Sequence, residues 1–579
     1  MTLVGFRPIL LLLSIGFSNM AFSAVTPLSL LVKQCLQLPP LSTGLDPKTS
    51  KKSAALAERM AQLEHQLLGF YNIKDRVNYY KQFSIHNDDK ESLLNCQFYL
   101  SDNLQRFLLS DQLTQLLPQL LNSPDNELSQ LGNRLYRLLY NQQAMETKSK
   151  LHTAQAAFKQ GLASQALTLS FNGDDCQLPP RNIARLSDQN EEKTPFNQSI
   201  ASYLLNQSQS QCRKKVWLAY QARTLKRNTP ILNTILDLQQ AQAKKKGFID
   251  YASLQTSAQI LYSPILVKAF LNSQTHAIRI TPWDLGFALK HANKSPFTVI
   301  NSSRFLTKIY QALNRYGISI DIISPQVHRV WLNGRLLGEL FISASKHFSY
   351  QPIRHLVVGQ QFGQIEIRSK ELISSYHDAK KMISTLTMAI ADLGNGSHFY
   401  FNNTLGETHD SANIGRYWLQ YSLTQTLIGE PQAHSREALI QAYSKQLHVF
   451  RAKVALNAYQ DKNHLAFNDL RQEFNDSFGE TWPQVDNYPV SFSAIVDEGP
   501  LYYTSLWQQS LALYLYQSTM VCQNQKAIFD TLIVNESAQS INQRLSGLLN
   551  TLMTPVILIK DMNKMSDDKH TPCSMTEVQ

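Results

Sequence analysis

Long apolar runs, paired metal-binding cysteines and standard nucleophile or phosphate motifs are all missing from this sequence. After residue 23, no stretch approaches 18 consecutive apolar residues, so we expect no transmembrane segment in the mature chain. No two cysteines form a CxxC pair, which disfavours a zinc knuckle or a dithiol redox site. Neither a Gly-x-Ser-x-Gly elbow nor a Walker loop occurs. What remains is the composition of a folded globular protein, with 43% hydrophobic and 17% charged residues.

The basic residues outnumber the acidic ones, giving a formal net charge of +11. Such a balance can attract phosphates, but the basic residues are spread along the chain and no nucleic-acid motif accompanies them. The densest segment, residues 213–246, has a helical pattern. We interpret it as a solvated helix face, with a polyanion site as the alternative, and expect no nucleic-acid partner.

The first 23 residues have the pattern of a signal peptide. Arg7 precedes the apolar run 8–17, and Ala21-Phe22-Ser23 fits the rule of small residues around a cleavage site. Cleavage would leave a soluble protein exported to the periplasm or secreted. The six cysteines that follow suit an oxidising compartment, and chain order suggests the disulfides Cys176–Cys212 and Cys522–Cys573.

Hydrophobic periodicity predicts a mainly α protein with one small β-sheet in the middle of the chain. Apolar residues three and four apart over 104–118 predict an amphipathic helix. Strand signals occur at 317–323, 327–332 and 336–343, with the hairpin dipeptide Asn333-Gly334 between the last two. Further strands are possible at 355–359 and 364–368.

The same pattern divides the chain into regions. We expect an N-terminal helical domain over 24–195, a larger domain over 196–520, and a C-terminal helix with a polar tail over 521–579. The boundary near 195 follows from a polar, unpatterned stretch at 188–195.

Two separated blocks carry a family resemblance. The first comprises residues 213–223, 228–238, 243–254 and Pro282-Trp283-Asp284 in that order, and the second is 491–507. Together they resemble the zinc metallopeptidases of the thimet oligopeptidase, oligopeptidase A and dipeptidyl carboxypeptidase family. This resemblance implies a helical ellipsoid with a deep channel, in which short peptides are cut at a zinc ion.

The zinc-binding motif of that family is absent. His-Glu-x-x-His puts two imidazoles on one helix face and a general base beside them, but no His-Glu dipeptide occurs in this sequence. The resemblance aligns Met388, Ala389 and Asp392 with the His, Glu and His positions, and Tyr417 with the third ligand. These degenerate positions predict no catalytic residue and no bound metal.

The substrate-facing block is also altered. The family's His falls at Ser493 or Ala494, and two of its Tyr positions read Glu498 and Ser505. Only Tyr502 and Tyr503 match, and these are the predicted peptide-binding residues. Polar residues near the lost motif are interpreted as loop residues, with a remodelled metal site as the alternative: His377, Asp378, His398, Glu407, His409 and Asp410.

Taken together, the sequence predicts an exported pseudopeptidase that binds a peptide or protein in the family's cleft without a cofactor. Two alternatives remain open at this stage. One is an active zinc metalloendopeptidase with displaced ligands, and the other is a ligand-free structural or envelope-associated protein.

Overall fold

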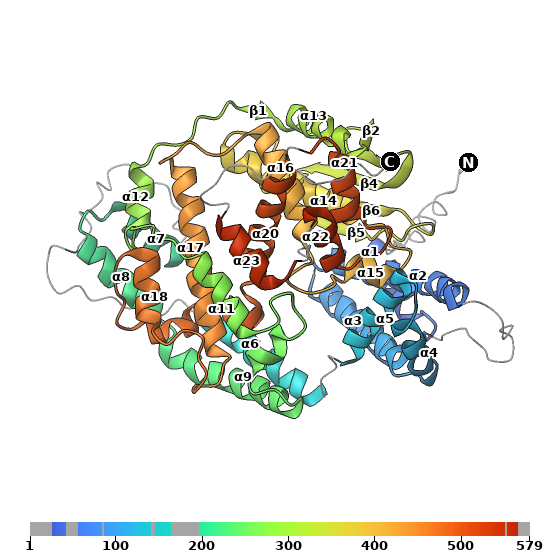
Figure 1. Cartoon of the computed structure of the whole chain (residues 1–579), viewed down its shortest axis with the longest axis horizontal. Helices are drawn as coiled ribbons and strands as arrows, with labels where there is room; N and C mark the ends of the chain where they lie inside the picture. Colours follow the sequence, from blue (N-terminus) through green and yellow to red (C-terminus); the bar gives the residue numbers. More distant parts are fainter. Residues whose placement is uncertain are drawn as a thin grey trace, which may run out of the picture.

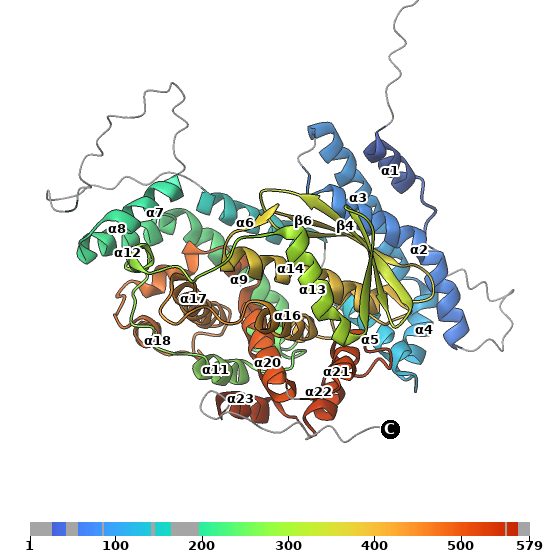
Figure 2. The same cartoon turned by 90° about the horizontal axis from the view of Figure 1, so that it is seen from above.

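The computed structural model describes residues 26–41, 56–83, 86–140, 145–163, 176, 196–520, 522–550 and 553–564. The predicted signal peptide over 1–23 lies outside these residues. Helices surround one small sheet, so the expected fold class is confirmed (Figure 1). Figures 1 and 2 both place α2–α5 at one end of the molecule and α7 and α8 at the other.

The N-terminal helices have their own hydrophobic core. They are α1 Pro27–Leu36, α2 Leu56–Tyr80, α3 Asn87–Leu108, α4 Asp111–Leu121 and α5 Asn126–Tyr140. The predicted helix over 104–118 is divided between α3 and α4. Ser110 causes the break, because its Oγ accepts a hydrogen bond from the backbone nitrogen of Leu113 and caps a new helix at 3.3 Å.

The next helices contribute to a second, larger core. They are α6 Met145–Ala163, α7 Phe196–Asn206, α8 Ser210–Ala222, α9 Leu225–Lys245, α10 Tyr251–Thr256, α11 Pro264–Ser273 and α12 Leu285–His291. The Pro282-Trp283-Asp284 segment anchors this region. The Trp283 side chain is fully buried, and Asp284 forms an ion pair of 2.5 Å with Arg213 of α8. These motif residues therefore have a structural role here.

A five-stranded sheet follows, with strand order β2-β3-β4-β6-β5. Its strands are β2 Ile318–Ser324, β3 Val327–Leu332, β4 Arg335–Ala344, β5 Ser349–Arg354 and β6 Gly363–Ser369. All pairs are antiparallel except β4–β6. The Asn333-Gly334 hairpin is confirmed: φ is 49° and 83° at its two central residues, as a type I′ turn requires. Residues 355–359 form only an isolated bridge, Val357–Gln361.

Helix α14, Tyr376–Gly394, packs against this sheet, and α16, Ile414–Leu427, lies beside it (Figure 2). Two glycines make the close approach possible. Gly338 of β4 pairs with Gly363 of β6, and a Cβ on Gly363 would lie 2.4 Å from Leu393 Cδ2. A larger residue at either glycine would push α14 off the sheet.

The remaining elements surround these two helices. They are the two-stranded pair β1 Ile300–Asn301 and β7 Leu372–Ile373, and the helices α13 Ser302–Leu313, η2 Asn314–Tyr316, α15 Tyr400–Thr404, α17 Arg436–Ala458, α18 Leu470–Phe478, η3 Val485–Ser491, α19 Ala494–Asp497, η4 Gly499–Leu501, α20 Thr504–Thr519, α21 Gln525–Phe529, η5 Asp530–Val534, α22 Ile541–Leu549 and α23 Pro555–Lys564. The η5 segment is a π-helix. Residues 525–564 thus hold several short helical elements.

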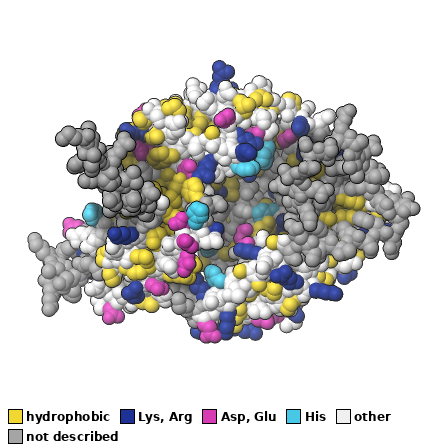
Figure 3. Space-filling view, turned by 180° about the vertical axis from the view of Figure 1, so that it is seen from behind, with side chains coloured by type: hydrophobic (Ala, Val, Ile, Leu, Met, Phe, Trp, Pro, Cys, Tyr) yellow, Lys and Arg dark blue, Asp and Glu magenta, His cyan; other side chains and the backbone are white. Residues whose placement is uncertain are grey.

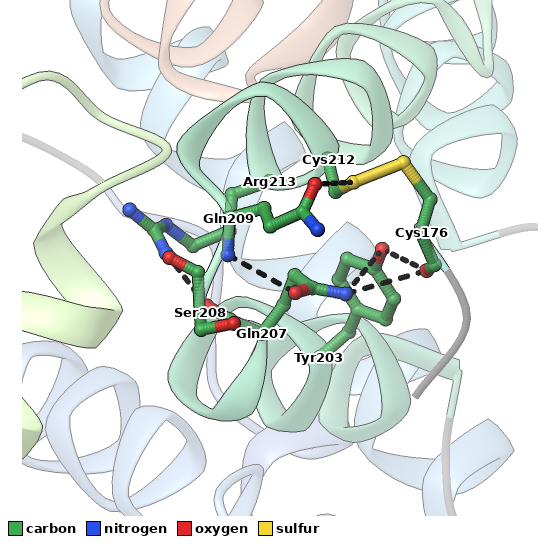
Figure 4. The surroundings of a disulfide bond; sticks show 7 residues. All are labelled: Cys176, Tyr203, Gln207, Ser208, Gln209, Cys212 and Arg213. Carbon is green, nitrogen blue, oxygen red and sulfur yellow. Dashed lines mark hydrogen bonds between the residues drawn. A yellow bond between two sulfur atoms is a disulfide. The ribbon is translucent and has the colours of Figure 1, made fainter. Parts of the chain in front are cut away.

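Two disulfides with both cysteines among the described residues join segments distant in sequence. The predicted bond Cys176–Cys212 is present, and Tyr203 Oη donates to the carbonyl oxygen of Cys176 beside it (Figure 4). The bond Cys35–Cys96 ties α1 to α3. The predicted Cys522–Cys573 pairing involves Cys573, which lies outside the described residues. Within the described ranges, no helix has the length and apolar character to span a bilayer.

Candidate functional site

The two segments that the resemblance assigned to metal binding are neighbouring helices, α14 and α16. Helix α14 begins at Ser375, whose Oγ accepts from the backbone nitrogen of Asp378 at 3.1 Å. The π-helix η5 crosses close to both helices: a Cβ on Gly394 would lie 2.9 Å from Ile533 Cγ2, and a Cβ on Gly415 2.5 Å from the Leu532 carbonyl oxygen. Glycine is therefore required at the end of α14 and the start of α16.

The side chains at the degenerate positions do not form a zinc-binding set. Ala389 is fully buried in the main core, while Met388 and Asp392 are partly exposed on α14. Tyr417 of α16 packs against the same core. A thioether, a methyl group, a phenol and a single carboxylate do not match the nitrogen, sulfur and carboxylate donors that zinc requires. Within the described residues, no three His, Cys, Asp or Glu side chains gather as a metal site.

The polar residues around the lost motif are occupied by structural contacts. Asp378 forms an ion pair with Lys370 at 2.7 Å. His398 Nδ1 lies 3.1 Å from a carboxylate oxygen of Glu127 on α5, so it helps to hold the N-terminal helices in place. His377 is exposed in the first turn of α14. The interpretation as loop residues therefore holds for His398 but is wrong for His377 and Asp378, which lie in the first turn of α14.

Asp410 is a buried structural carboxylate. It accepts hydrogen bonds from the backbone nitrogens of Ile260 and Leu261, at 3.0 and 3.1 Å, and from the Thr408 hydroxyl. Burial raises the pKa of Asp410 even though these donors oppose the shift. Its neighbour His409 is exposed. The carboxylate thus joins the loop before α16 to the turn after α10.

The two retained tyrosines differ in access. Tyr503 is 1% exposed, and its hydroxyl lies 3.5 Å from Asp410 Oδ2. Tyr502 is partly exposed, and its ring centroid lies 4.4 Å from that of His448. The Tyr502 ring is therefore accessible from solvent, whereas Tyr503 is a core residue.

Sequence reasoning missed His448 and Arg451 of α17. His448 Nε2 lies 2.9 Å from the Tyr502 carbonyl oxygen, and burial lowers its pKa, which favours the neutral ring. Arg451 Nε donates to Tyr488 Oη at 2.7 Å, and its guanidinium lies over the ring of Phe492 at 5.3 Å. The only sequence signal was their spacing of three residues, which places them on one helix face without a recognisable motif.

Asp392 faces a polar cavity rather than a metal cluster. The cavity has a volume of about 230 Å³ and lies where the end of α14 meets α15, α16, η5, α22 and α5. Burial raises the pKa of Asp392 to about 7, although the positive charge of Arg416 opposes the shift. A carboxyl group with this pKa is partly protonated at neutral pH and can donate as well as accept a hydrogen bond.

A second hollow, of about 470 Å³, lies beside α12 and is lined in part by Asp284, Phe287 and Phe478. Its main charged groups are already paired, because Asp284 is bound to Arg213.

The face seen in Figure 3 is hollowed near its centre, and basic, acidic and histidine side chains surround the hollow.

Comparison with known proteins identifies the fold. No protein-family model matches the sequence, and no curated protein matches it either. Among solved structures, PZ peptidase A in complex with an inhibitor aligns with a TM-score of 0.53 at 12% identity, over 93% of this chain and 96% of that one. A protein assigned as oligoendopeptidase F aligns with a TM-score of 0.52 at 12% identity, over the same shares. The chain therefore has the fold of these oligopeptidases.

Proposed function

We propose that this chain is an exported, non-catalytic member of the oligopeptidase fold that binds a peptide or protein in the position of the peptidase cleft. One observation carries the proposal: α14 and α16 lie side by side, but Met388, Ala389, Asp392 and Tyr417 offer no zinc-binding set. The helices that carry the chemistry in the zinc peptidases serve here as a scaffold.

The binding surface in this proposal is the wall around Tyr502. An extended peptide could stack a side chain on the Tyr502 ring. Arg451, which is partly exposed, could donate a hydrogen bond to a peptide carbonyl or carboxylate from a nitrogen that does not bond Tyr488. Disulfides and the absence of a membrane-spanning helix among the described residues agree with an exported protein.

Two measurements on the purified mature chain test the absence of catalysis. We expect no stoichiometric zinc by elemental analysis and no cleavage of short quenched peptides that responds to a chelator. A stoichiometric zinc together with chelator-sensitive cleavage would contradict the proposal and show an active metalloendopeptidase. The peptidase fold makes this activity the main alternative.

A third measurement tests binding. We expect a mixed peptide library to raise the melting temperature, because a ligand that binds only the folded state stabilises it. The variant Tyr502→Ala should lose this shift, whereas Tyr136→Ala, at an exposed tyrosine of α5, should keep it. If no peptide raises the melting temperature of the wild type, the alternative of a ligand-free structural protein would be favoured.

A further inference from the structure

The polar cavity at the end of α14 is too small for a long peptide but large enough for one small molecule. Its volume of about 230 Å³ corresponds to roughly seven water molecules. None of the residues of the Tyr502 wall contributes to its lining. The cavity is therefore a candidate site of its own, separate from the surface used in the proposed function.

Three guanidinium groups line the cavity, and they come from three distant helices. Arg134 lies on α5, Arg416 on α16 and Arg544 on α22. Two carboxyl groups, Asp392 and Glu407, oppose them. Because Asp392 has its pKa raised to about 7, its charge is only partly developed at neutral pH, and the lining is positive overall.

The three arginines differ in the hydrogen bonds that they form within the protein. Arg134 Nε donates to the Leu405 carbonyl oxygen at 2.9 Å, and Arg544 Nη1 donates to that of Leu532 at 3.3 Å. The Nε atoms of Arg416 and Arg544 are buried without a hydrogen-bond partner among the described residues. A buried donor left unpaired costs about 1–3 kcal/mol, so these two side chains of the cavity lining have hydrogen-bonding capacity that the described residues do not use.

An unpaired acceptor lies in the same cavity. Asn402 Oδ1 is buried without a partner within the described ranges, while the Asn402 amide nitrogen donates to the Glu127 carbonyl oxygen at 3.1 Å. Guanidinium groups bind carboxylates with strong, directional hydrogen bonds. An amide oxygen, with the carboxyl of Asp392 nearby in the lining, suits a nitrogen donor. The cavity thus offers complementary partners to both ends of an amino-acid unit.

We propose that this cavity binds an α-amino-acid unit, with its carboxylate on Arg416 and Arg544 and its α-nitrogen toward Asn402 and Asp392. The unit could arrive as a free amino acid or as the C-terminal residue of a peptide. The recognised chemistry is the same in both cases: a free carboxylate next to a nitrogen that carries hydrogen.

Calorimetric titration with alanine, alanyl-alanine and the C-terminal amides of both tests the proposal. We expect a measurable affinity for at least one free acid at concentrations up to about 10 mM, ten times the Kd of a weak site near 1 mM. Binding of alanine would identify free amino acids as the source, and binding of alanyl-alanine alone would identify a peptide end. Equal binding of the amides, or no binding of any free acid, would overturn the proposal.

Two variants locate the site. Arg416→Gln removes the unpaired guanidinium, and Ala391→Leu fills the cavity from α14; each should weaken binding of the free acid by about tenfold or more. Arg471→Gln, at an exposed arginine of α18, is the matched control and should bind as the wild type does. Circular dichroism shows which variants fold, and wild-type affinity in a folded Arg416→Gln or Ala391→Leu protein would contradict the assignment.

A further experiment distinguishes binding in this cavity from peptide binding at the surface around Tyr502. A longer peptide with an amidated C-terminus has no free carboxylate, so its stabilising effect should persist in Arg416→Gln and disappear in Tyr502→Ala. Loss of both effects in Arg416→Gln would count against a separate amino-acid site.

Discussion

Two buried polar regions, both next to the segment that follows α14, differ in how their charges are partnered. In the first, Asp75 of α2 accepts hydrogen bonds from the backbone nitrogen and Nδ1 of His355, at 3.0 and 2.9 Å, and from the Tyr400 hydroxyl. In the second, the cavity beside Asp392, Arg416 has a buried Nε without a partner among the described residues. Both carboxylate oxygens of Asp75 thus have donors in the first region, whereas the guanidinium of Arg416 in the second has a nitrogen that no described residue bonds.

The first region, which we name the Asp75 network, joins α2 to α15 within the N-terminal hydrophobic core. Tyr400 stacks on Tyr71 of α2 with ring centroids 4.0 Å apart, and its backbone nitrogen donates to Glu64 at 2.7 Å. Burial opposes ionisation of Asp75, but the hydrogen bonds and charge of His355, with the Tyr400 hydroxyl, hold its pKa below the usual value. Full pairing of buried polar groups is what stability alone requires.

Breaking the Asp75 network should have the largest effect. Asp75→Ala leaves the buried Tyr400 hydroxyl and two donors of the half-buried His355 without an acceptor, so we expect a loss of about 3–5 kcal/mol in the free energy of unfolding. Urea denaturation followed by circular dichroism measures it. Asp102→Ala, at an exposed aspartate of α3, is the control and should change stability by less than about 0.5 kcal/mol. Equal stability of the two variants would remove the contrast between the regions.

The raised pKa of Asp392 in the cavity should make the free energy of unfolding depend on pH. The pKa of Asp392 is about 7 in the folded protein and near 3.8 when unfolded, so the folded state holds this proton more tightly. Its contribution to stability is fully present below pH 4 and is lost as pH rises through 7. Asn cannot ionise, so Asp392→Asn should gain about 2 kcal/mol over the wild type at pH 8.

Urea denaturation at pH 5 and pH 8 tests this prediction. The advantage of Asp392→Asn should be small at pH 5 and grow toward pH 8. Glu64→Gln is a useful comparison, because burial also raises the pKa of Glu64 to about 7. An advantage that does not change with pH would show that Asp392 keeps an ordinary pKa.

A milder change in the Asp75 network should cost less. Tyr400→Phe keeps the stacked ring but removes the hydroxyl that donates to Asp75 and accepts from Lys74 at 3.2 Å. We expect a loss of about 1.5 kcal/mol in the free energy of unfolding. In a double-mutant cycle with Asp75→Ala, the two losses should not add, because both remove the same hydrogen bond. Additive losses would show that the hydroxyl contributes elsewhere.

The smallest effect should come from the cavity arginine. Without ligand, Arg416→Ala removes a guanidinium that lies over the ring of its neighbour Tyr417, 4.9 Å from the ring centroid. We expect the free energy of unfolding to change by no more than about 1 kcal/mol in either direction. A loss as large as that of Asp75→Ala would mean that Arg416 is a structural residue.

The sequence predicted those parts of the molecule that local patterns determine. Alternation and the Asn333-Gly334 dipeptide located β3 and β4, because strand period and turn chemistry act over a few residues. The break at Ser110 was missed because the apolar spacing continues across it, and a single capping serine outweighed the periodicity.

The cavity could not be predicted in this way. The resemblance marks Asp392 only as a lost ligand, and the cavity residues Arg134 and Arg544 lie more than 150 residues away along the chain in either direction. Arg416 stands next to Tyr417, the position that aligns with the family's third zinc ligand, but one arginine on a helix has no distinguishing pattern. Only tertiary packing brings the three guanidinium groups together.

The contact from Arg134 to Leu405 has a consequence for the order of folding. It joins residues 271 positions apart and forms one wall of the cavity. Closing so long a loop carries a large entropic cost, whereas hairpins and neighbouring helices form from local contacts. We therefore expect the cavity to be among the last features to form, when the N-terminal helices dock onto the rest of the chain. A ligand of the cavity would therefore bind only after the whole chain has folded.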